Sequence, residues 1–122
     1  MANMFYNFEM QPNGILQVKV VGDFSDEDTE GYLQELYAYA DKLPEGEQLH
    51  SLLDATGIGK VSPNVRRAVA SSLEDPRFGK TAVWGDNRFV KVLVDFLLKA
   101  TGRQDMRYFT GKEEAINWLL ID

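Results

Sequence analysis

The stretch LLDATGIGKVSP, residues 52–63, contains the transition that decides the fold. It begins as an apolar run, passes two glycines and a lysine, and ends in Ser62-Pro63. That pair is typical of a helix start, because serine caps the free amides and proline fits the first helical position. A phosphate-binding loop would need wider glycine spacing and a serine or threonine directly after Lys60, where Val61 stands instead. We therefore expect a buried strand, a loop and a helix.

Strands and helices alternate outward from this stretch. Apolar runs bounded by turn residues predict strands over 4–10, 15–22, 49–55, 80–85 and 105–109. Helical spacing and capping residues predict helices that begin at Ser25, Ser62, Asn87 and Thr110, the last with Glu113 completing a capping box. In this last helix Ala115, Trp118 and Leu119 are the expected core anchors.

The element order β-β-α-β-α-β-α-β-α predicts an α/β fold. Strands that alternate with helices favour a single, mostly parallel sheet, and the turn at Pro12 to Gly14 adds the first strand as an antiparallel hairpin edge. No internal repeat, low-complexity tract or linker interrupts the pattern. We expect one domain over residues 1–122.

Composition narrows the class of protein. The chain has no cysteine, which rules out disulfides and thiolate metal sites and fits a reducing cytoplasm. The first ten residues lack the features of a signal peptide, and no apolar run is long enough to span a membrane. The net charge of -6 argues against a general nucleic-acid binder.

The charges are unevenly distributed along the chain. Residues 23–47 hold nine acidic residues against one lysine, whereas residues 60–107 hold ten basic residues against five acidic ones. Two solvated faces of opposite charge would explain this. Alternatively, a basic face meets an anionic partner or ligand; its residues would be Lys60, Arg66, Arg67, Arg88 and Lys91.

Familiar catalytic and metal-binding patterns fail on inspection. The acidic run SDEDTEG resembles the front of a calcium loop, but Tyr37 stands where that loop needs a bidentate acid. A dehalogenase-type phosphatase would need its first aspartate at a strand end, whereas here the acids follow the helix cap Ser25. His50 is the only histidine and is expected at a strand entrance. We assign no catalytic residue, no metal and no cofactor.

A ligand crevice is predicted where two strands end. Ligands bind open α/β sheets at the carboxyl ends of strands, and helix N-termini at Ser62 and Asn87 would point free amides there. Trp84 would close the core or line this crevice. The predicted ligand-binding residues are Asp54, Thr56, Gly57, Lys60, Ser62, Trp84, Asp86 and Arg88.

Three segments resemble the SpoIIAA-like proteins, small bacterial domains grouped with STAS domains and the Sec14/CRAL-TRIO lipid-binding fold. They are LLDATGIG, KTAVWGDNRFVKVLVDFLLKATG and, above all, MRYFTGKEEAINWL. The resemblance covers nearly the whole chain. It implies a sheet of four or five strands with helices, and a role in binding rather than turnover.

The resemblance also raises the question of a phosphorylation switch at Ser62. Anti-sigma-factor antagonists carry a phosphorylatable serine in an Asp-Ser-Ser-Gly type motif after the third strand. The matching region here is KVSPNV, in which Pro63 and Asn64 depart from that motif. A helix cap already explains Ser62.

The function expected from these features is that of a non-enzymatic, STAS-like binding or regulatory module. Its ligand would be a protein partner or a small apolar or anionic molecule. The alternative is a small lipid- or acyl-binding domain of Sec14/CRAL-TRIO type. An enzyme ranks third, because no nucleophile, base and orienting group can be assembled.

The helix over 87–101 is apolar around most of its circumference. With Phe89 facing the sheet, its companions there would be Val92, Leu93, Phe96 and Leu97. A second stripe of Val90, Val94 and Leu98 would then need another cover. Other parts of this domain such as the helix from Thr110, a bound apolar ligand or another chain could cover this stripe. We expect a homodimer through a symmetric contact.

Overall fold

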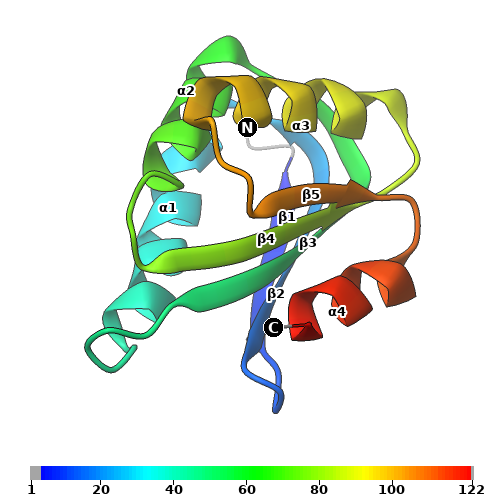
Figure 1. The fold of residues 1–122 in the computed structure, drawn as a ribbon. Coiled ribbons are helices and arrows are strands. Elements are labelled where there is room, and N and C mark those ends of the chain that lie inside the picture. The colour runs from blue at the N-terminus through cyan, green and yellow to red at the C-terminus, as the bar shows by residue number, and fades with distance from the viewer. Residues whose placement is uncertain (1–3, 122) are drawn as a thin grey trace.

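The computed structural model describes residues 4–121 and contains a five-stranded sheet in the order β1-β2-β3-β4-β5. The strands are β1 (Phe5–Met10), β2 (Ile15–Phe24), β3 (Leu49–Val61), β4 (Phe78–Trp84) and β5 (Met106–Phe109). β1 pairs antiparallel with β2, and all other neighbours are parallel (Figure 1). The predicted mixed sheet with an antiparallel hairpin edge is confirmed. The ends of the predicted domain, residues 1–3 and 122, lie outside the described residues.

The connections determine which face of the sheet each helix covers. The helices are α1 (Asp26–Asp41), α2 (Pro63–Ser72), α3 (Arg88–Thr101) and α4 (Lys112–Leu120). The first three join neighbouring parallel strands that advance in one direction, so right-handed crossovers place them on one face. α4 follows the last strand and covers β3, β4 and β5 on the opposite face (Figure 1). The β1–β2 side of that second face stays open.

Each face has its own hydrophobic core. The larger core lies between the sheet and α1, α2 and α3, with Leu16, Val65 and Val90 among its fully buried side chains. The smaller core lies under α4 and contains the predicted anchors Ala115 and Leu119, with Trp118 packed against it. The predicted anchors of the last helix are therefore confirmed.

The prediction of a loop after residue 55 is wrong, because β3 continues to Val61 and pairs there with the end of β2. The two glycines allow this close pairing. A Cβ at Gly57 would lie 3.2 Å from a methyl group of Val21, and a Cβ at Gly59 would overlap the Asp23 carboxylate. That carboxylate accepts the Lys60 N–H at 2.9 Å. The glycines thus serve strand packing and not phosphate binding.

Three of the four predicted polar caps are confirmed, and the first of them, Ser25, is the N-cap of α1. Ser62 accepts the Val65 N–H at 3.2 Å, and Asn87 accepts the Val90 N–H at 3.1 Å. The predicted capping box of the last helix is wrong. α4 begins one residue later than expected, so Gly111 and not Thr110 occupies the cap position, and it offers no side-chain bond.

The predicted orientation of α3 is confirmed for Leu93 and Leu97, which are buried, and wrong for Phe89, Val92 and Phe96, which are not. Its buried positions are Val90, Leu93, Val94 and Leu97, which follow the i, i+3, i+4, i+7 spacing of a core stripe. Val90 and Val94 are 0% and 2% exposed, so the proposed interface of Val90, Val94 and Leu98 loses two of its three residues to the core, and Leu98 is half-buried. The aromatic rings at Phe89 and Phe96 flank the stripe instead. A homodimer stays a prediction, without this basis.

Candidate functional site

Strand register aligns polar side chains on the open part of the second face. One row across the sheet pairs Asn7 with Lys19, Lys19 with Asp54, and Asp54 with Trp84. The next row pairs Glu9 with Gln17, and continues onto β3. Side chains two residues apart on a strand share a face, so both rows point to the same side of the sheet.

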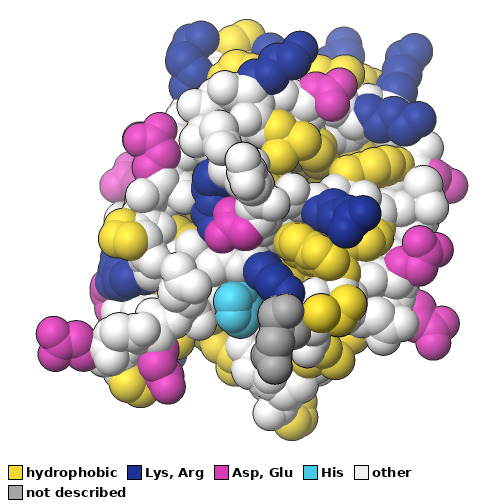
Figure 2. All heavy atoms as spheres, in the orientation of Figure 1, with side chains coloured by type: hydrophobic (Ala, Val, Ile, Leu, Met, Phe, Trp, Pro, Cys, Tyr) yellow, Lys and Arg dark blue, Asp and Glu magenta, His cyan; other side chains and the backbone are white. Residues whose placement is uncertain are grey.

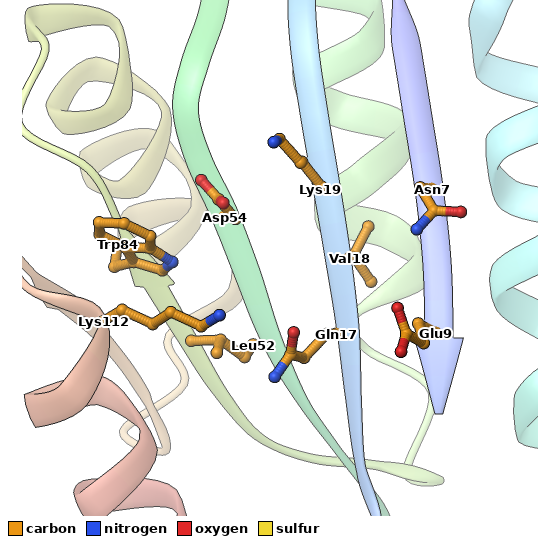
Figure 3. A pocket seen from close by; sticks show the side chains of 9 residues that line it. All are labelled: Asn7, Glu9, Gln17, Val18, Lys19, Leu52, Asp54, Trp84 and Lys112. Carbon is orange, nitrogen blue, oxygen red and sulfur yellow. The ribbon is translucent and has the colours of Figure 1, made fainter. Parts of the chain in front are cut away.

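These two rows form the floor of a hollow of about 200 Å³ (Figure 3). The first turn of α4 contributes Lys112 from one side, which Figure 3 shows extending past Trp84. The lining residues are Asn7, Glu9, Gln17, Val18, Lys19, Leu52, Asp54, Trp84 and Lys112. Polar and charged side chains predominate, so the hollow suits a polar molecule better than an apolar one.

Several polar groups of this hollow have no partner among residues 4–121. Among the described residues, no hydrogen bond or ion pair involves the side chains of Glu9, Lys19 or Lys112. Within residues 4–121, the Asp54 side chain bonds only inside its own strand, where one carboxylate oxygen accepts from the Thr56 backbone N–H at 3.1 Å and from the Thr56 hydroxyl at 2.7 Å. The indole N–H of Trp84 is buried and has no acceptor in the described part of the chain.

Only Asp54 and Trp84, of the eight predicted ligand-binding residues, line this hollow. Lys60 follows Asp54 by six residues, up to about 20 Å along an extended strand, and lines a different hollow. Asp86 is exposed, and the Arg88 guanidinium lies over the Phe89 ring at 5.3 Å. The eight residues therefore do not form one crevice, because β3 runs on past the end of β4.

Thr56 and Gly57 likewise have local structural roles. Thr56 bonds to Asp54 as described, and its carbonyl accepts the Asn87 side-chain amide at 3.1 Å. Gly57 packs against β2. The helix-capping residue Asn87 thus ties α3 to β3 in the region where the sequence suggested a ligand.

Ser62 is engaged on both sides. Besides capping α2, its hydroxyl donates to Asp26 on α1 at 2.6 Å, and Asn64 donates to the same carboxylate at 3.1 Å. These two hydrogen bonds, the Ser62 bond foremost, lower the pKa of Asp26 below its ordinary value. A phosphate on Ser62 would be repelled by this negative carboxylate. The contact therefore favours a capping role for Ser62 over a phosphorylation switch.

A second hollow of about 240 Å³ lies between α2, α3 and the end of β3. We call it the α2–α3 surface, and it is lined by Lys60, Val61, Arg66, Phe89, Val92 and Leu93. Val92 is 54% exposed, and the Arg66 guanidinium lies over the Phe96 ring at 5.2 Å. Figure 2 shows Lys and Arg side chains gathered along the edge that α2 and α3 form in Figure 1.

Sequence reasoning missed most of the polar hollow. Asn7, Glu9, Gln17, Lys19 and Lys112 were not singled out, although polar residues alternate with apolar ones in both strands of the hairpin. That alternation signals a solvent-facing side but does not identify its neighbours. No group of three or more potential metal ligands occurs among residues 4–121, and no helix there is long and apolar enough to cross a membrane.

Comparisons with solved structures show the same fold. An uncharacterized protein from the DUF3478 family with a SpoIIAA-like fold, from Shewanella loihica PV-4, matches with a TM-score of 0.72 and 18% identity, over 96% of this chain and 94% of that one. An anti-sigma factor antagonist from Mycobacterium paratuberculosis matches with a TM-score of 0.71 and 13% identity, over 95% and 93%. The unphosphorylated anti-sigma factor antagonist SpoIIAA matches with a TM-score of 0.65 and 13% identity, over 93% and 96%.

Sequence comparison supplies the family. No curated protein matches the chain. The model of the SpoIIAA-like family, in contrast, matches residues 15–120, which include everything from β2 to the end of α4. The resemblance noted in the sequence is thereby confirmed, and the chain belongs to the SpoIIAA-like family.

Proposed function

We propose that this chain is a non-enzymatic regulatory module that acts by binding a partner protein at the α2–α3 surface. The observation that carries the proposal is an exposed apolar side chain, Val92, set in a hollow with two cations, Lys60 and Arg66. An apolar centre with a charged rim is the usual composition of a protein interface. Two of the proteins that share the fold are anti-sigma factor antagonists, named for opposing another protein.

The charges of this surface define the partner's chemistry. The Arg66 side chain makes no hydrogen bond or ion pair with a described residue, and its Nε is buried without a partner. Lys60 is exposed, its backbone N–H donates to Asp23, and its side chain makes no hydrogen bond or ion pair with a described residue. A partner that inserts an apolar side chain beside Val92 and presents carboxylates to the two cations would satisfy the surface.

The interior gives no support to the lipid- or acyl-binding alternative. The apolar hollow between the sheet and α1, α2 and α3 has a volume of only about 20 Å³. Since a single water molecule needs roughly 10–15 Å³, this hollow has no room for an acyl chain.

Affinity capture of partner proteins from the native host tests the proposal. The matched variants change two exposed valines that lie on opposite faces of the sheet. Val92→Glu changes the α2–α3 surface, whereas Val21→Glu makes the same substitution on the open face of β2. We expect the unmodified chain and Val21→Glu to retain the same partner, and Val92→Glu and Lys60→Glu to lose it. Binding should weaken with added salt, because its rim contacts are ionic. Retention of that partner by Val92→Glu would contradict the proposal, as would a failure of the unmodified chain to retain any partner.

A further inference from the structure

The polar hollow on the open face contains charges of both signs, and three of them, on Glu9, Lys19 and Lys112, make no hydrogen bond or ion pair with a described residue. All four charged side chains line the hollow of about 200 Å³: Lys112 and Asp54 lie on the side of Trp84, Glu9 lies on the opposite side, and Lys19 lies between them (Figure 3). Lys19 and Asp54 are register partners on neighbouring strands, yet no ion pair joins them among the described residues. These groups are therefore available to a ligand with both a negative and a positive group.

The position of Lys112 is not explained by helix stability. It is the first residue of α4, where the positive end of the helix dipole disfavours a cation. Its side chain instead extends toward the hollow, past the indole ring of Trp84 (Figure 3). A lysine that is unfavourable for its own helix but faces an open polar hollow is well placed to receive an anionic group.

Trp84 gives independent support for an anionic group at the same end. Its indole N–H is buried and has no acceptor among the described residues, which is costly for a polar group. Figure 3 shows the ring nitrogen on the side that faces Asp54 and Lys112. A carboxylate oxygen drawn in by Lys112 would supply the missing acceptor.

We infer that the hollow binds a small zwitterion with one carboxylate and one ammonium group. The carboxylate lies between Lys112 and the Trp84 N–H, and the ammonium lies toward Glu9 at the opposite rim. The volume corresponds to about seven water molecules at roughly 30 Å³ each, which fits a molecule of amino-acid size. Equal numbers of lysines and carboxylates make the site unfavourable for a ligand that carries only one sign of charge. This site lies on the face of the sheet opposite to α2 and α3, so the inference stands independently of the partner surface.

Fluorescence of Trp84 tests the inference in a Trp118→Phe background, where Trp84 is the only tryptophan left. The probes are glycine, β-alanine and 4-aminobutyrate, with acetate and methylammonium as single-charge controls. At least one zwitterion should change the fluorescence at a concentration at least about tenfold lower than either control. Calorimetric titration of the unmodified chain repeats the comparison and covers a failure of the background variant to fold.

Matched variants then assign the two ends. Lys112→Met and Glu9→Gln should each weaken binding of that zwitterion about tenfold, the usual scale for one charge-assisted contact. Lys99→Met and Glu35→Gln make the same changes at exposed positions outside the hollow and should leave binding unchanged. The inference is overturned if no zwitterion binds below about 10 mM, a concentration at which binding is very weak. It is also overturned if acetate or methylammonium binds as tightly as the zwitterion, or if the control variants weaken binding as much as the site variants.

Discussion

Truncation of two valines on the same turn of α3 should change the free energy of unfolding by very different amounts. Val94 is 2% exposed, and Val94→Ala removes two buried methyl groups, each worth about 0.8 kcal/mol in transfer plus a cavity term. Allowing about 0.5 kcal/mol for the better helix propensity of alanine, we expect a loss of about 2 kcal/mol. Val92 is 54% exposed, so its truncation loses less hydrophobic free energy, and the better helix propensity of alanine nearly cancels that loss. The free energy of unfolding of Val92→Ala should therefore lie within about 0.5 kcal/mol of that of the unmodified chain.

Urea denaturation measures both variants. With a slope of about 2 kcal/mol/M, Val94→Ala should lower the midpoint by about 1 M while Val92→Ala barely moves it. Equal slopes would show that the folded and unfolded states are otherwise comparable. A loss at Val92 equal to that at Val94 would refute the orientation of α3 and, with it, the exposure on which the α2–α3 surface depends. The same logic predicts that Val94→Glu prevents folding, whereas Val92→Glu folds.

Substitutions at three further positions test individual contacts of the fold. Ser62→Ala should cost about 1 kcal/mol by loss of the helix cap, and Ser62→Asp should not recover all of it, because its carboxylate would face Asp26. The lowered pKa of Asp26 means that its ionised carboxylate stabilises the fold above the ordinary carboxyl pKa. This stabilisation is lost as the pH falls and the carboxylate is protonated. The loss of unfolding free energy caused by Ser62→Ala should therefore become smaller in acid. Arg103→Met should lower the free energy of unfolding, measured by heat or urea, by about 3 kcal/mol. The Arg103 guanidinium donates to the backbone carbonyls of Leu73, after α2, and Phe78, at the start of β4, and the substitution leaves both without this donor. Gly59→Ala should cost about 1 kcal/mol by displacing the Asp23 carboxylate, and little in an Asp23→Ala background; equal costs in both would contradict that contact.

The sequence predicts the architecture well, because the relevant signals are local. Turn residues, caps such as Ser62 and Asn87, and the alternation of strands with helices were sufficient to predict all nine elements and the mixed sheet. The errors occur where tertiary contacts decide. The partner strand extends β3 through Gly57 and Gly59, and the packing of α3 selects the valines rather than the larger aromatic rings.

The candidate sites could be predicted only in part. Asp54 and Trp84 do lie next to each other, because they are register partners on β3 and β4, but Lys60 lines another hollow. Lys19 and Lys112 could not be connected to them from the sequence. Their meeting depends on the register of β2 against β3 and on the return of α4 over the second face, and neither is a local property.

Chemical-shift mapping of the isotope-labelled chain with its captured and purified partner tests the central claim most directly. The account predicts that backbone amide signals shift at the α2–α3 surface, around Lys60, Arg66 and Val92, and stay in place around Lys19 on the opposite face. The ligand hollow then serves as an internal control within the same experiment. Shifts confined to the open face of β1 and β2, with the α2–α3 surface unaffected, would contradict the proposed function.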